Sequence, residues 1–93
     1  MQDTDRTARI TAALQHAFGP SELVVTDESH LHRGHAGAAT GKGHFHVRIV
    51  SPAFAGKGPV ARHRMVYAAL ADLLETDIHA LGIDASTADE VAR

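Results

Sequence analysis

A chain of 93 residues, 44% of them hydrophobic, is the size of one domain with a single modest core. Its formal net charge of −2 argues against bulk attraction to nucleic acid or to an anionic membrane. It has no cysteine, which excludes disulfides and thiolate metal sites made by this chain alone, and no apolar run approaches the ~20 residues of a membrane span. We therefore expect a soluble, cytoplasmic protein whose metal chemistry, if any, uses imidazole or a partner's thiolates.

The first half of the chain predicts one helix and two strands. Apolar residues recur at helical spacing over residues 4–18, and Gly19-Pro20 is a helix stop signal. Residues 23–26 form a β-branched run between turn residues, which predicts a strand. Residues 44–51 alternate between polar and apolar side chains, which predicts a half-buried strand antiparallel to the first, with its histidines on the polar face.

The second half predicts a long helix, a third strand and a short helix. Pro59 suits the first helical position, where its missing N–H costs nothing. The apolar stripe that follows has three- and four-residue spacing and consists of Val60, His63, Val66, Tyr67, Leu70, Leu73 and Leu74. From it we predict structural roles for His63 and Tyr67, with His63 buried in the core. Residues 78–85 alternate again, and Ser86-Thr87 followed by Glu90 matches a capping box.

The order of these elements predicts a single α+β domain over residues 1–93. The second and third strands are joined through a helix, so we expect them to lie parallel with a right-handed crossover. The predicted fold is a three-stranded mixed sheet with helices packed on one face.

Residues 30–43 show no helical or strand periodicity and are expected to form a flexible loop rich in glycine and histidine. His30, His32 and His35 have a spacing that suits chelation of zinc, nickel or copper. For any one of them taken alone, a solvated loop histidine without a function is the commoner case. The loop is therefore the first candidate for a metal site.

Several strings of the sequence resemble the BolA family. They are Asp27-Glu28-Ser29, His44-Phe45, Val50-Ser51, Phe54-x-Gly56, Arg62-His63-Arg64-x-Val66-Tyr67 and Ile78-His79-Ala80-Leu81. The resemblance covers nearly the whole chain, and the last two strings are specific when they occur together in this order. It implies a fold like the class II KH domain, with the order α-β-β-α-α-β-α and a short helical turn around Phe54.

The resemblance also implies a non-enzymatic partnership with a monothiol glutaredoxin in iron–sulfur assembly, transfer or iron regulation. The two proteins would share a [2Fe–2S] cluster ligated by a glutaredoxin cysteine, glutathione and two imidazoles of the BolA-like chain. His79 matches the family's ligand histidine, although its place in the third strand also suits a half-buried core-edge residue. His32 is the best match by spacing for the second ligand, with His35 and His30 as alternates, and His44 also resembles a family position.

Lys57, Arg62 and Arg64 gather around the start of the long helix, where helix N-termini attract anions. They suit recognition of glutathione or an acidic partner surface, a nucleic-acid backbone, or simply a solvated helix start. The nucleic-acid interpretation leads to an alternative function, a DNA-binding transcriptional regulator. However, a KH clamp uses a Gly-x-x-Gly loop, and this chain has Gly56-Lys57-Gly58 instead. No catalytic Ser/His/Asp motif is present, so we do not expect an enzyme.

Overall fold

The computed structural model describes residues 3–29 and 41–92, with side chains from residue 6 onward. Over this part of the chain the elements are α1 (Asp3–Phe18), β1 (Glu22–Asp27), β2 (Gly43–Val50), the 3-10 helix η3 (Pro52–Phe54), α2 (Pro59–Ala69), α3 (Ala71–Thr76), β3 (Ile78–Ser86) and α4 (Ala88–Ala92). The predicted α+β class and element order are confirmed, including a helical turn at Phe54. The likeness to the class II KH domain stays a prediction. None of the described helices is long and apolar enough to cross a membrane.

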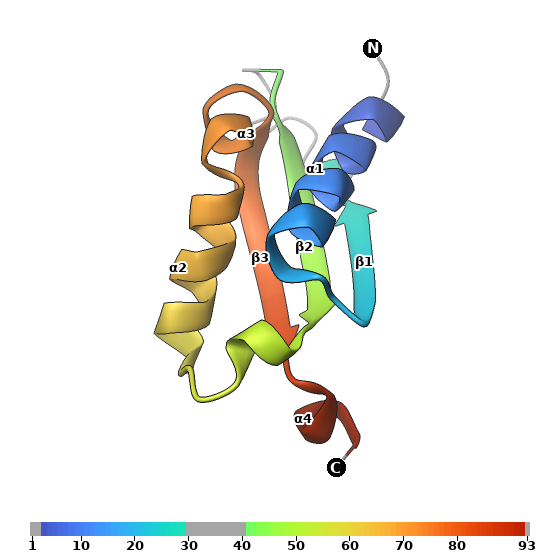
Figure 1. Ribbon diagram of the computed structural model, residues 1–93. Helices are drawn as coiled ribbons and strands as arrows, with labels where there is room; N and C mark the ends of the chain where they lie inside the picture. Colours follow the sequence, from blue (N-terminus) through green and yellow to red (C-terminus); the bar gives the residue numbers. More distant parts are fainter. Residues whose placement is uncertain (1–2, 30–40, 93) are drawn as a thin grey trace.

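The three described strands form one mixed sheet in the order β1-β2-β3. β1 runs antiparallel to β2, and β2 runs parallel to β3, as predicted. Figure 1 shows α1 and α2 lying over the same face of this sheet. The core fills the space between the helices and the sheet, and its buried residues are Ile10, Leu14, Phe45, Val47, Ile49, Phe54, Val66, Leu70 and Ile78.

The buried face of α2 differs from the predicted stripe. His63 is exposed, with its ring Nδ1 2.8 Å from the carbonyl oxygen of Pro59, and Tyr67 is 42% exposed. The prediction that His63 is buried is therefore wrong. The helix instead turns Val66 and Leu70 fully inward, beside the partly buried Arg62, Met65 and Ala69. Both stripes have helical spacing and share residues 66 and 70, and the hydrogen bonds of Arg62 allow it to lie half-buried on the stripe that faces the core.

A β-bulge at the start of β3 changes which side chains face the core. Gly43 pairs with Ile78, but the next residue, His44, pairs with Ala80, so His79 is the extra residue of the bulge. Ile78 is consequently buried and His79 exposed, which corrects the half-buried position expected from simple alternation. His44 is also a correction, because its side chain is only 7% exposed instead of lying at the surface.

Candidate functional site

The bulge brings two histidines together at the beginning of β3. The ring centroids of His44 and His79 lie 5.1 Å apart, with the ring planes inclined by 56°. His44 comes from the central strand and is buried, whereas His79 comes from the neighbouring strand and is exposed. The pair therefore has one ring held inside the fold and one open to a partner.

This geometry fits shared metal ligation. Two imidazoles bound to one tetrahedral metal, each nitrogen about 2.0–2.1 Å away, have ring centroids about 5 Å apart. Histidine replaces cysteine on one iron in known [2Fe–2S] centres, so the donor type also fits. No group of three or more histidine, cysteine or acidic side chains suited to a metal occurs in the described part of the chain. A metal held by these two imidazoles would therefore need further ligands from elsewhere.

Local hydrogen bonds hold His44 against the end of β1. The Ser29 hydroxyl accepts from the His44 backbone N–H at 3.1 Å, and the His44 carbonyl accepts from the Glu28 N–H at 2.7 Å. Ser29 is itself held by its N–H, which donates to Asp27 Oδ1 at 2.8 Å. These bonds explain why the string Asp27-Glu28-Ser29 precedes the loop: it closes the turn that leads from β1 and anchors His44.

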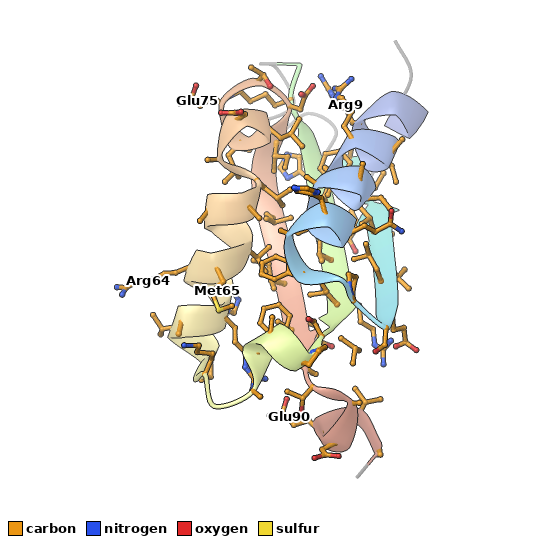
Figure 2. All side chains as sticks on the ribbon, in the orientation of Figure 1. Arg9, Arg64, Met65, Glu75 and Glu90 are labelled. Carbon is orange, nitrogen blue, oxygen red and sulfur yellow. The ribbon has the colours of Figure 1, made fainter. Side chains whose placement is uncertain are left out.

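A cluster of charged side chains lies just before β3. Asp77 Oδ1 accepts from Arg6 Nε at 3.2 Å and from Arg9 Nη2 at 2.8 Å, and Thr76 Oγ1 donates to Asp77 Oδ2 at 2.9 Å. Burial alone would raise the pKa of Asp77, but the hydrogen bonds from Thr76 and Arg6 and the charge of Arg9 lower it overall. The Asp77 carboxylate is therefore held ionised at the beginning of β3. Its partner Arg9 is labelled in Figure 2.

The loop histidines predicted as second ligands, His30, His32 and His35, lie outside the described residues. Both flanking segments lie close to the His44–His79 pair in the chain or in space: Ser29 binds the His44 backbone, and Gly41 is three residues before His44. The sequence did not predict that His44 is buried beside His79, because strand alternation assigned it to the polar face. The available signal was its place in the His44-Phe45 string.

Of the three predicted anion-binding residues, Arg62 is paired with a carboxylate, whereas Lys57 and Arg64 are exposed. Arg62 forms a bidentate pair with Glu90, Nη1 to Oε1 at 2.7 Å and Nη2 to Oε2 at 2.9 Å, and it donates to the carbonyls of Lys57 and Ala85 at 2.8 and 3.0 Å. The Arg62 hydrogen bond and the Thr87 backbone N–H lower the pKa of Glu90 to about 2. Lys57 and Arg64 are exposed, and Arg64 points away from the body of the protein (Figure 2).

The metal and anion candidates lie at opposite ends of β3. His79 stands at its beginning, while Arg62 binds the carbonyl of Ala85 near its end, beside α4 (Figure 1). At about 3.3 Å per residue, the six steps between these positions span about 20 Å. One glutathione bound at the histidine pair would therefore not reach Arg62.

Comparisons with known proteins agree with this structure. Residues 14–90 match the family model described as BolA-like protein. "SufE-like protein 1, chloroplastic/mitochondrial" of Arabidopsis thaliana is 47% identical over 91 residues, covering 92% of this chain but only 24% of that protein. "DNA-binding transcriptional regulator BolA" of Escherichia coli is 43% identical over 82 residues, covering 88% of this chain and 75% of the relative.

A solved structure, the "BolA domain of SufE1 from Arabidopsis thaliana", superimposes with a TM-score of 0.82 at 41% identity, covering 97% of this chain and 98% of that one. The sequence and structural similarities thus extend over almost the same residues. The chain belongs to the BolA-like family.

Proposed function

We propose that this chain is a non-enzymatic partner of a monothiol glutaredoxin, with which it shares a glutathione-dependent [2Fe–2S] cluster. The observation that carries the proposal is the His44–His79 pair, whose 5.1 Å ring separation suits two ligands of one metal. A cysteine-free chain requires thiolates from outside, which a glutaredoxin cysteine and glutathione supply. The role is cluster assembly, cluster transfer or iron regulation in the reducing cytoplasm.

The proposal assigns distinct tasks to the two histidines. His79 is exposed, so it presents an imidazole nitrogen to a cluster carried on the partner's surface. His44 is buried and its backbone N–H donates to the Ser29 hydroxyl, so its ring is confined by burial before the partner arrives, which lowers the entropy cost of binding. We favour His44 as the second ligand, and His32, with alternates His35 and His30, is the competing assignment. When bound, the cluster supplies the iron and sulfide that the complex delivers or senses.

One relative carries this domain as part of a longer chain. The Arabidopsis SufE-like protein carries the same domain as about a quarter of its length. Exposed Arg64 and Tyr67 lie on α2, which has no acidic residue, and exposed Lys57 lies just before this helix; we propose these three residues for contact with an acidic partner surface.

The test is co-expression with a monothiol glutaredoxin in the presence of glutathione, followed by visible absorbance and circular dichroism of the purified complex. We expect His79→Ala and His44→Ala each to abolish or strongly alter the cluster spectrum. His63→Ala is the matched control, because His63 is exposed on α2 and should leave the spectrum unchanged. If His79→Ala has no effect, the proposal is wrong; if His44→Ala has none but His32→Ala does, the second ligand is the loop histidine.

A DNA-binding transcriptional regulator is the alternative function. Its support is the name of the Escherichia coli relative and the exposed cations Lys57 and Arg64. Pairing of Arg62 with Glu90 removes one of the three predicted cations from this surface. The alternative requires a salt-dependent gel shift of a DNA fragment by the protein alone, weakened in Lys57→Ala/Arg64→Ala but not in Arg9→Ala.

A further inference from the structure

We infer that Arg6 of α1 is a positioning residue that sets the distance between His44 and His79. That the histidine pair binds a metal rests on the proposed function. The positioning of the two rings by Arg6 is a property of the protein without any metal. The sheet is weakened at this point: a bulge disrupts the hydrogen-bond ladder where the two histidine-bearing strands meet. Strand pairing alone therefore constrains the two rings less than it would in a regular ladder.

The Arg6 guanidinium bridges the two segments that lead into these strands. Its Nε donates to the carboxylate of Asp77, two residues before His79, and its Nη2 donates to the carbonyl of Gly41, three residues before His44. The side chain is only 21% exposed, so the bridge is partly shielded from water. One planar group from α1 thus joins the segment before β2 to the segment before β3.

Backbone bonds show that this bridge acts on a connected unit. The Gly43 N–H donates to the Asp77 carbonyl at 2.9 Å, and the Asp77 N–H donates to the Leu73 carbonyl at 2.7 Å. Movement of Asp77 would therefore shift Gly43, which directly precedes His44. The geometry assigns to Arg6 the task of holding this unit against α1 while the ladder is interrupted.

Arginine suits this task because its guanidinium offers several donors in a rigid fork, whereas lysine offers a single nitrogen on a flexible stem. Arg9 provides a matched comparison within the same helix. It donates to the same Asp77 oxygen, but its side chain is 50% exposed, and within the described residues its hydrogen bonds end there. Arg6→Lys and Arg9→Lys both keep the charge, and only the first removes the bridge to Gly41.

The experiment uses a full-length parent in which His30, His32 and His35 are replaced by Asn, so that zinc reports on His44 and His79. Without metal, NMR measures the nuclear Overhauser effect between the His44 and His79 rings. Zinc is then titrated while the imidazole nitrogen signals are followed. For Arg6→Lys we expect loss of the ring–ring effect and zinc affinity weakened by about 10-fold, the size usual for residues that orient metal ligands. For Arg9→Lys we expect both to stay within about 2-fold of the parent.

Each outcome is decisive for one of the two proposals. If Arg6→Lys keeps the ring–ring effect, or if both lysine variants lose it equally, the positioning role of Arg6 is refuted. If the parent shows the ring–ring effect but no zinc response at either ring, the ligand pair fails, while the effect of Arg6→Lys without metal still tests the positioning role. Equal far-ultraviolet circular dichroism of parent and variants establishes that the fold is retained.

Discussion

Gly43 shows how the absence of a side chain supports the site. A Cβ at this position would lie 2.7 Å from Cε2 of the buried Phe45 and 2.8 Å from the Ser29 hydroxyl, the group that binds His44. Gly82 has a similar close approach, but there the neighbour is Cδ2 of His46 at 2.9 Å, on a side chain that is only partly buried. Similar distances thus imply unequal costs, because a ring in the core cannot move as a partly exposed imidazole can.

Gly43→Ala is therefore expected to destabilise the protein by about 1–3 kcal/mol through overpacking. Gly82→Ala should change the free energy of unfolding by less than about 1 kcal/mol, because His46 can rotate away and alanine restricts the unfolded chain. Urea unfolding followed by circular dichroism measures both variants. Equal losses of stability would contradict the distinction between the two glycines.

At the residue scale, features made by sequence neighbours could be predicted, whereas features made by residues distant in the chain could not. The capping box was predictable, because Thr87 and Glu90 are neighbours; the Thr87 N–H donates to Glu90 Oε1 at 2.8 Å. The burial of His44 was not, because a residue of the central strand is covered by neighbours that are distant in the chain, such as His79 of β3. His79 was identified as a ligand candidate by family resemblance, whereas its exposure follows from the bulge.

At the scale of elements, α4 is attached through charge more than through burial. None of its residues is buried, and its Glu90, labelled in Figure 2, pairs with Arg62 of α2. A carboxyl whose pKa is lowered by folding stabilises the native state above its unfolded pKa, and this contribution disappears as the pH falls through the folded pKa. For Glu90 that window runs from its ordinary value of 4.5 down to about 2.

We accordingly expect α4 to detach as the pH is lowered from about 4.5 to about 2, while the sheet is less affected. Amide hydrogen exchange of residues 88–92, measured by NMR at several pH values, follows the detachment. Glu90→Gln should give fast exchange in α4 already at neutral pH, with little further change in acid. Asp89→Asn is the control from the same helix and should keep the pH dependence. The same behaviour in both variants would show that the Arg62–Glu90 pair is not responsible for the detachment.

The helices also show what the sequence pattern did not predict, namely a break in the long helix and the face of α2 that is buried. Helical spacing predicted that residues 59–74 are helical, and most are, but the chain interrupts the helix at Leu70, whose φ of −107° and ψ of 15° separate α2 from α3. The periodicity did not decide which face of α2 is buried. The buried face carries Val66 and Leu70 together with the half-buried Arg62, whose hydrogen bonds to Ala85 and Glu90 join it to residues distant in the chain.

At the scale of the whole molecule, stability depends on one layer of apolar side chains between α1, α2 and the sheet. Leu14 and Ile10 of α1 are fully buried in it, and Phe54 joins it from η3, with its ring centroid 5.1 Å from that of Phe18. Domains of this size have net stabilities of about 5–15 kcal/mol. A single large cavity in this layer therefore removes a considerable share of the total.

Leu14→Ala should lower the free energy of unfolding by about 2–5 kcal/mol and reduce the thermal midpoint accordingly. Val60→Ala is the control, because Val60 is 64% exposed and alanine is the better helix former. Thermal unfolding monitored at 222 nm measures both. A loss for Val60→Ala as large as that for Leu14→Ala would mean that the core is misassigned.

The parallel pairing of β2 and β3 has a consequence for how a ligand of the proposed histidine pair would act on stability. Parallel strands require a crossover, here made by α2 and α3, so His44 and His79 meet only after most of the chain has folded. An unfolded chain offers no such pair. Any ion or cluster that binds both rings would therefore stabilise the native state by mass action, by about 2.7 kcal/mol at a ligand concentration one hundred times Kd. If the proposed pair binds such a ligand, the loaded protein would be unfolded less often and would therefore be cleaved more slowly by proteases in the cell.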